Sequence, residues 1–145
     1  MLIAVHQITC SAKPTAVWAT WADVKNWPTW DHEIESCELS GPFKLGAKGV
    51  LKPRNGPKTP FQLAEVNEGQ SFRDVSFLPL AKLTFTHEIE ATADGCTFRH
   101  RIEINGPLSF LFSRIFGKKM KVGLPIAMER LAEIAVARAP TGGAQ

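Results

Sequence analysis

The sequence has few cysteines and no long apolar run. Cys10, Cys37 and Cys96 are an odd number, and they show neither a CxxC motif nor metal-ligand spacing. Such usage argues against a disulfide framework and favours a reducing, cytoplasmic location. No stretch approaches the roughly 20 apolar residues of a membrane-spanning helix. The N-terminus, Met-Leu-Ile-Ala-Val-His, also lacks the basic region and long apolar run of a signal peptide.

Motifs of several common enzyme and binding classes are missing as well. There is no GxSxG-type turn, and no cysteine has an obvious activating partner, so a nucleophilic enzyme is not expected. The glycines do not lead from a strand into a helix in a phosphate-cradling pattern, which argues against a nucleotide cofactor. A net charge of +3 with scattered basic residues gives no sign of a nucleic-acid partner. We therefore expect neither a cofactor nor nucleic-acid binding.

The chain does have the composition of an ordinary soluble globular domain, with 44% hydrophobic and 21% charged residues. Its 145 residues suffice for one domain, which we expect to span residues 1–139, with a flexible tail over 140–145. Asp31-His32-Glu33 has the composition of a metal site, but neighbouring side chains in an extended chain point apart. We expect this segment to be solvated and to bind no metal. The oligomeric state is not indicated.

The longest predicted element is a helix over Pro107–Ala139. Asn105-Gly106-Pro107 is a helix start signal, because asparagine or glycine suits the cap and proline suits the first turn. Apolar residues recur at helical spacing in two sets, and the second set is turned by about a third of a circle from the first. The first set is Leu108, Leu111, Phe112, Ile115 and Phe116, and the second is Met120, Leu124, Ala127, Met128, Leu131, Ile134 and Ala135. Two interpretations stay open: one helix kinked near Pro125, or two shorter helices joined between Gly117 and Pro125.

Ahead of this helix the sequence predicts one strand, two short helical segments and about six further strands. The first strand is Leu2–Cys10, and a helix starts near Pro14. All four tryptophans lie between positions 18 and 30. Trp18 and Trp21 are expected to seal the core, whereas Trp27 and Trp30 either do the same or border a binding site. The later strands are Ile34–Leu39, Gly49–Pro53, Phe61–Val66, Ser71–Leu78, Ala81–Thr92 and Thr97–Asn105.

The best-patterned hairpin joins the last two strands. Apolar residues on these strands, with His87 and His100 among them, alternate with polar ones. Asp94-Gly95 as the two-residue turn sets His87 opposite Ile102. The two histidines would then be diagonal neighbours, about 7 Å apart, on the apolar face. No carboxylate occupies an evidently inward position on the well-patterned strands, so the candidate acid/base groups are His87, His100 and His6.

This order of elements gives an α+β fold in which antiparallel strands curve around the long helix. Six features carry a family resemblance: Pro14-Thr15-Ala16-Val17-Trp18, Ala22-Asp23, Trp27-Pro28-Thr29-Trp30, Gly41-Pro42-Phe43 through Gly46 and Gly49, the Asp94-Gly95 hairpin, and Gly106-Pro107-Leu108. With them the chain resembles the START-like (Bet v 1-like, SRPBCC) superfamily, and within it the small bacterial polyketide cyclase/dehydrase and lipid-transport proteins.

The resemblance implies a helix-grip fold, and it covers nearly the whole chain. In this fold a curved antiparallel sheet of about six or seven strands wraps around the C-terminal helix, with two short helices after the first strand. The first strand pairs with the last one, which would bring His6 towards His87 and His100. Members of the superfamily enclose a cavity for apolar ligands, and they include lipid carriers, hormone binders and aromatic polyketide cyclases.

We predict that the protein binds or carries a hydrophobic small molecule, lipid-like or polycyclic aromatic, in an internal cavity. The predicted ligand-binding residues are Trp27, Trp30, Phe85, His87, Ile89, Phe98, His100, Ile102, Phe112, Met120 and Leu124. The main alternative is a polyketide cyclase/dehydratase-type enzyme, in which His87 and His100 would move a proton.

A third possibility is a protein that contacts lipid at the membrane surface. The segment Ser109–Phe116, followed by Lys118-Lys119, could rest on anionic lipid. The simpler interpretation, which we prefer on the sequence, is a buried first turn beside a solvated lysine patch.

Overall fold

The computed structural model of the chain describes residues 1–142, with side chains as far as Arg138. The strands are β1 (Leu2–Cys10), β2 (Ile34–Ser40), β3 (Lys48–Pro53), β4 (Thr59–Asn67), β5 (Ser71–Leu78), β6 (Ala81–Thr92) and β7 (Gly95–Asn105). The helices are α1 (Pro14–Ala22), the 3-10 helix η1 (Val24–Thr29) and α2 (Ser109–Gly142). This is the predicted order of one strand, two short helices, six strands and a long helix.

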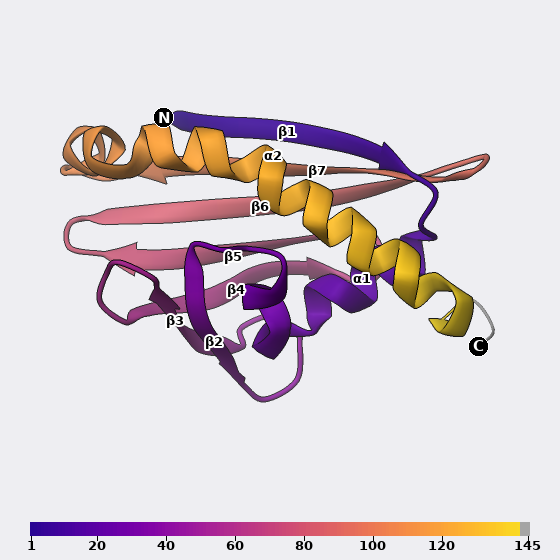
Figure 1. Cartoon of the computed structure of the whole chain (residues 1–145). Helices are drawn as coiled ribbons and strands as arrows, with labels where there is room; N and C mark the ends of the chain where they lie inside the picture. The colour runs from indigo at the N-terminus through magenta and orange to yellow at the C-terminus, as the bar shows by residue number, and fades with distance from the viewer. Residues whose placement is uncertain (143–145) are drawn as a thin grey trace.

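The seven strands form one antiparallel sheet with the order β1-β7-β6-β5-β4-β3-β2. The pairing of β1 with β7 confirms that the first strand joins the last one. The segment α1-η1 carries the chain from one edge of the sheet to the other, and α2 then crosses over the sheet (Figure 1). The structure therefore has the predicted helix-grip fold.

Helix α2 is one uninterrupted helix, so the interpretation as two shorter helices is wrong. Figure 1 shows its first turns running along β1 and the later turns slanting towards α1, so the helix changes direction along its course. The predicted start at Pro107 is two residues early, because Pro107 and Leu108 form a turn. The N–H of Leu108 donates to the carbonyl of Leu80 and holds that turn against the β5–β6 connection. The helix is assigned as far as Gly142, and positions 143–145 of the expected tail lie outside the described residues.

The β6–β7 register differs from the predicted one. Thr92 pairs with Gly95, so Ala93 and Asp94 form the turn, and His87 lies directly opposite His100 rather than Ile102. Gly95 belongs to β7, where its backbone lies so close to the carbonyl of Cys10 that a Cβ atom would clash. The turn dipeptide alone suggested the wrong pairing, because the strand β1 beside Gly95 also constrains the register.

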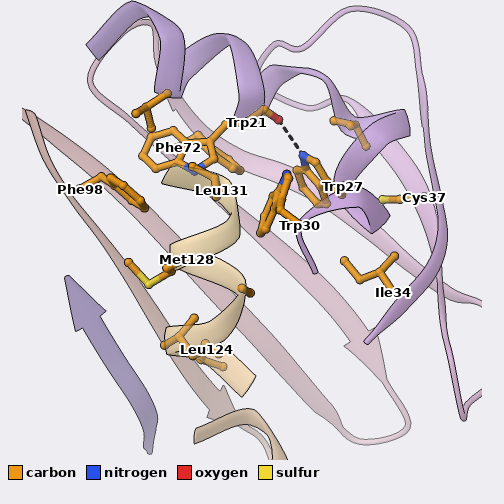
Figure 2. Close-up of a cluster of buried hydrophobic side chains, with 14 of the residues drawn as sticks. Trp21, Trp27, Trp30, Ile34, Cys37, Phe72, Phe98, Leu124, Met128 and Leu131 are labelled. Atoms are coloured by element: carbon orange, nitrogen blue, oxygen red, sulfur yellow. Dashed lines mark hydrogen bonds between the residues drawn. The ribbon is translucent and has the colours of Figure 1, made fainter. Parts of the chain in front are cut away.

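The core lies between the sheet, the segment α1-η1 and the second half of α2. Figure 2 shows Trp21, Trp27 and Trp30 gathered near Phe72 of the sheet and Leu131 of α2. The largest fully buried side chains are Trp21, Phe61, Phe72, Phe98, Leu63, Ile104, Met128 and Leu131. Before Leu124, α2 contributes only half-buried side chains to this core, namely Phe112, Phe116 and Met120.

Candidate functional site

Three histidines form a row across β1, β7 and β6. His6 pairs with His100, and His100 pairs with His87, so their side chains share the inner face of the sheet. His87 and His100 are buried, at 6% and 4% exposure, and their ring centroids lie 4.5 Å apart. Cross-strand pairing thus brings together the histidines that the sequence singled out. His87 and His100 are directly opposite each other, which is a closer arrangement than the predicted diagonal one.

Aromatic rings and one indole N–H surround this pair. Trp21 of α1 donates from Nε1 to Nε2 of His100 over 3.1 Å. The acceptor nitrogen must be unprotonated, so His100 is neutral in this arrangement. The ring of His87 stacks on Phe72 with centroids 3.9 Å apart and an interplanar angle of 5°. The histidine pair is therefore enclosed by packed rings.

Asp74 on β5 is the residue of this site that the sequence analysis missed. Its side chain is buried, and Oδ1 lies 3.8 Å from Nδ1 of His87, beyond hydrogen-bond distance. Both atoms are buried and have no hydrogen-bond partner among the described residues, and the same holds for Nε1 of Trp30. The search for inward carboxylates covered only the well-patterned strands, and β5 is not one of them. In β5 the two alternating sets of residues both mix polar and apolar side chains, so the pattern could not tell which set faces the core.

Burial pushes the pKa values of Asp74 and His87 in opposite directions. It raises the pKa of Asp74 to about 8 and lowers the pKa of His87 to about 3. Burial also holds the pKa of His100 well below its ordinary value, with smaller contributions from the charges of His87 and His6. At neutral pH Asp74 is then a protonated acid and His87 a neutral base, so the pair is not an ion pair despite its short separation.

The segment Asp31-His32-Glu33 is only partly solvated. His32 and Glu33 are exposed, and Glu33 forms an ion pair with Lys119 of α2 over 3.1 Å. Asp31 is half-buried, and burial raises the pKa of its carboxyl. Within residues 1–142 no group of three or more histidine, cysteine, aspartate or glutamate side chains has an arrangement that could hold a metal ion.

The predicted ligand-binding residues fall into two groups. Buried in the core are Trp27, Trp30, His87, Phe98, His100, Ile102 and Leu124. Half-buried at its margin are Phe85, Ile89, Phe112 and Met120. Nε1 of Trp27 donates to the carbonyl of Trp21 over 2.8 Å, which gives Trp27 a packing role (Figure 2). An open hollow of about 350 Å³ lies at the β1 edge, beside Val5, His6, Gln7 and Arg99, and none of the predicted ligand-binding residues lines it.

The sequence analysis preferred a buried first turn for the C-terminal helix, but the first turns of α2 expose large apolar side chains. Phe110 and Ile115 are 61% and 67% exposed, and Leu111 is exposed as well. Only Phe112, Phe116 and neighbouring positions on the opposite side of the helix are half-buried. In the described part of the chain, no helix has the length and apolar character needed to cross a membrane.

Comparison with solved structures shows the same fold at low sequence identity. TTHA0849 from Thermus thermophilus superposes with a TM-score of 0.73 at 14% identity, over 94% of this chain and 98% of that one. The di-domain ARO/CYC StfQ from the steffimycin biosynthetic pathway gives a TM-score of 0.73 at 11% identity, over 94% of this chain and 51% of that one. Norcoclaurine synthase from Thalictrum flavum gives a TM-score of 0.69 at 14% identity, over 92% of this chain and 85% of that one.

One family of known sequences matches almost the entire chain. No curated protein sequence matches. The family described as "Polyketide cyclase / dehydrase and lipid transport" matches residues 1–138, which include every strand and the described side chains of α2. The chain therefore belongs to the polyketide cyclase/dehydrase and lipid transport family, whose START-like helix-grip fold it shares.

Proposed function

We propose that this protein binds a hydrophobic small molecule, lipid-like or polycyclic aromatic, between the sheet and α2, with the polar group of the ligand at Asp74 and His87. The observation that carries the proposal is the pair of unpartnered buried atoms, Oδ1 of Asp74 and Nδ1 of His87. Leaving a buried polar atom without a partner costs about 1–3 kcal/mol. A ligand group that pairs with both atoms would recover that cost.

The chemistry of the two atoms suggests what the ligand carries. A protonated Asp74 can donate a hydrogen bond, and a neutral His87 has one donor and one acceptor nitrogen. A hydroxyl or carbonyl group fits both partners without bringing a charge into the core. The rings of Phe72 and Trp21 beside His87 favour an apolar or aromatic skeleton around that group.

The half-buried apolar residues support a place for that skeleton. Phe85 and Ile89 of β6 and Phe112 and Met120 of α2 pack against the core without being enclosed by it. Covering such side chains with a ligand removes apolar surface from water at about 25 cal/mol per Å². We include Trp30 in the proposed site because its buried Nε1 has no hydrogen-bond partner within the described chain.

Native mass spectrometry of the purified protein tests the proposal first, through detection of a co-purified apolar molecule. A titration with 2-naphthol and with naphthalene then tests the polar end, because the two probes differ only in the hydroxyl. We expect 2-naphthol to bind about tenfold more tightly, as one recovered hydrogen bond is worth about 1.4 kcal/mol. His87→Phe should abolish that preference, and Trp30→Ala should weaken binding of both probes. The exposed His32→Phe serves as control.

Stability is measured separately by urea unfolding of each variant. If His87→Phe unfolds more easily yet keeps the preference for 2-naphthol, the histidine pair is structural and the proposed site is wrong. Ligand-induced quenching or a shift of tryptophan emission that disappears in Trp30→Ala would support the place of Trp30. If tryptophan emission does not change when the ligand binds, Trp30 has a packing role only.

The opposed pKa shifts favour one second function, an acid/base enzyme of the cyclase or dehydratase type. A protonated acid beside a neutral base is the pairing that proton abstraction next to a carbonyl requires. We test it by following deuterium exchange next to the carbonyl of 1-tetralone in D₂O. Catalysed exchange that Asp74→Asn abolishes while 1-tetralone still binds would favour the enzyme, and binding without exchange would favour the carrier.

A further inference from the structure

The first half of α2 exposes a row of large apolar side chains. Leu111, Ile115, Val122 and Ile126 are all exposed, at 41%, 67%, 61% and 51%. At about 100° per residue they fall within about 60° of arc, so they form one stripe along the helix. A contiguous exposed apolar stripe is unusual on a monomeric protein and indicates a contact surface.

Two further exposed apolar residues lie near the start of α2. Leu80, between β5 and β6, is exposed, and its carbonyl accepts the N–H of Leu108. Phe110 lies two residues further on and is 61% exposed. The end of the molecule where α2 begins (Figure 1) is therefore apolar on the helix and on the adjoining turn.

The charges beside the stripe are all of one sign. Arg114, Lys118, Lys119 and Lys121 are the charged residues of α2 before Glu129, and none of the positions 109–128 is acidic. Lys119 is engaged by Glu33, whereas Arg114, Lys118 and Lys121 are exposed and form no ion pair among the described residues. On the helix these three lie on one flank of the apolar stripe.

We infer that the first half of α2 docks the protein onto the surface of an anionic lipid bilayer. The apolar stripe enters the boundary between headgroups and acyl chains, and Arg114, Lys118 and Lys121 contact the anionic headgroups. The complementary charge is what selects this partner, since an apolar stripe alone would fit a protein surface equally well. The helix lies along the surface and does not cross it, in agreement with the finding that no helix of the described residues is both long and apolar enough to cross a membrane.

Flotation of the full chain with lipid vesicles tests the inference. Vesicles of phosphatidylcholine with added phosphatidylglycerol should capture the protein, and vesicles of phosphatidylcholine alone should not. Raising the salt from about 0.1 M to about 1 M shortens the screening length from about 10 Å to about 3 Å, so capture should fall. The triple variant Arg114→Gln, Lys118→Gln, Lys121→Gln should lower the partition coefficient about a hundredfold, since each basic residue near the surface contributes about 1 kcal/mol.

Two matched controls change residues away from α2. Phe110→Ser with Ile115→Ser removes two exposed apolar side chains from the start of α2, and Leu45→Ser with Val50→Ser removes two exposed apolar side chains near β3. Lys25→Gln, Lys48→Gln, Lys58→Gln removes the same number of exposed charges elsewhere. The stripe variants should lose capture and the controls should keep it.

Three outcomes would overturn the inference. These are no capture by anionic vesicles, equal capture by neutral and anionic vesicles, and capture that the control variants lose as strongly as the stripe variants. Sedimentation of the free protein adds a fourth: a dimer that Phe110→Ser with Ile115→Ser converts to a monomer would assign the stripe to a second copy of the chain instead.

Discussion

At the scale of single residues, the interior of this protein keeps polar groups that it does not satisfy. His100 accepts a hydrogen bond from Trp21, but Asp74, His87 and Trp30 each have one buried polar atom without a partner in the part of the chain that the structure describes. A core selected for stability alone would replace such groups with apolar side chains of the same shape. We interpret these unpartnered groups as ligand contacts, because a bound hydroxyl or carbonyl group would supply the missing hydrogen bonds.

The shifted pKa of Asp74 should be visible in the pH dependence of stability. Its pKa rises from 3.8 to about 8 on folding, so the folded chain keeps a proton that the unfolded chain releases. Between these two values the contribution of Asp74 to the free energy of unfolding falls as the pH rises. The lowered pKa values of His87 and His100 act in the opposite direction below pH 6.5, where the unfolded chain takes up protons that the folded chain refuses.

At about pH 7.5, one unit above the ordinary histidine pKa of 6.5, the unfolded histidines hold few protons, so the window from about pH 7.5 to about pH 8.5 separates Asp74 from the two histidines. Wild-type protein should lose stability across this window, and Asp74→Asn should lose markedly less, because asparagine does not titrate. The measurement is urea unfolding of both proteins at the two ends of the window. Identical pH slopes for the wild type and Asp74→Asn would show that Asp74 keeps an ordinary carboxyl pKa in the folded state.

At the scale of elements, the two halves of α2 have different roles. The second half is anchored in the core by Met128, Leu131 and Ala135, which have no exposed surface. Arg138 also forms an ion pair with Asp23 at the end of α1 over 3.5 Å. The first half is half-buried on one side and exposes an apolar stripe on the other. One helix thus serves as core element and as contact surface.

Truncation of one leucine and one isoleucine on α2 should separate these roles. Leu131→Ala should lower the free energy of unfolding by about 2–5 kcal/mol, because it leaves a cavity in the core. Ile126→Ala, at a side chain 51% exposed, should change it by about 0.5 kcal/mol or less. Chemical denaturation of both variants checks the difference. Similar losses would mean that Ile126 is covered in solution, by a second copy of the chain or another partner.

At the scale of the whole molecule, the β1–β7 pairing links the beginning of the chain to its last strand. Cys10 and Cys96 lie opposite each other in this pair, and Cys37 lies on β2 at the other edge of the sheet. Cys37 and Cys96 are buried, and burial raises the pKa of each thiol to about 12. Both thiols are therefore protonated and shielded as long as the sheet is intact.

These thiols should report the opening of the whole fold. The Cys10→Ser variant removes the half-buried thiol and leaves two of the three cysteines. In native buffer Ellman's reagent should label neither thiol within minutes, and in denaturant it should label both at once. Adding Leu131→Ala should speed native labelling in proportion to the lost stability, if labelling requires global opening. If native labelling is fast and its rate is the same with and without Leu131→Ala, the thiols become accessible by local opening at an edge of the sheet.

Much of the architecture followed from the sequence by itself. The sequence predicted the strands of the β6–β7 hairpin, the order of elements and the long C-terminal helix. These features are predictable because alternation and helical periodicity are patterns among residues that are close together in the sequence. The family was also recognisable from the sequence. The residues His87 and His100 were identified as an inward pair on the same grounds.

Only the tertiary structure decided how these elements meet. Asp74 could not be assigned to the core, because the alternation in β5 is ambiguous and burial depends on what covers the strand. The turn at Ala93-Asp94, and with it the facing of His87 and His100, depends on the neighbouring strand β1. The exposure of Ile115 likewise depends on where α2 leaves the sheet. Helical spacing puts apolar residues on a common face, but it does not say whether that face meets the core, a ligand or another surface.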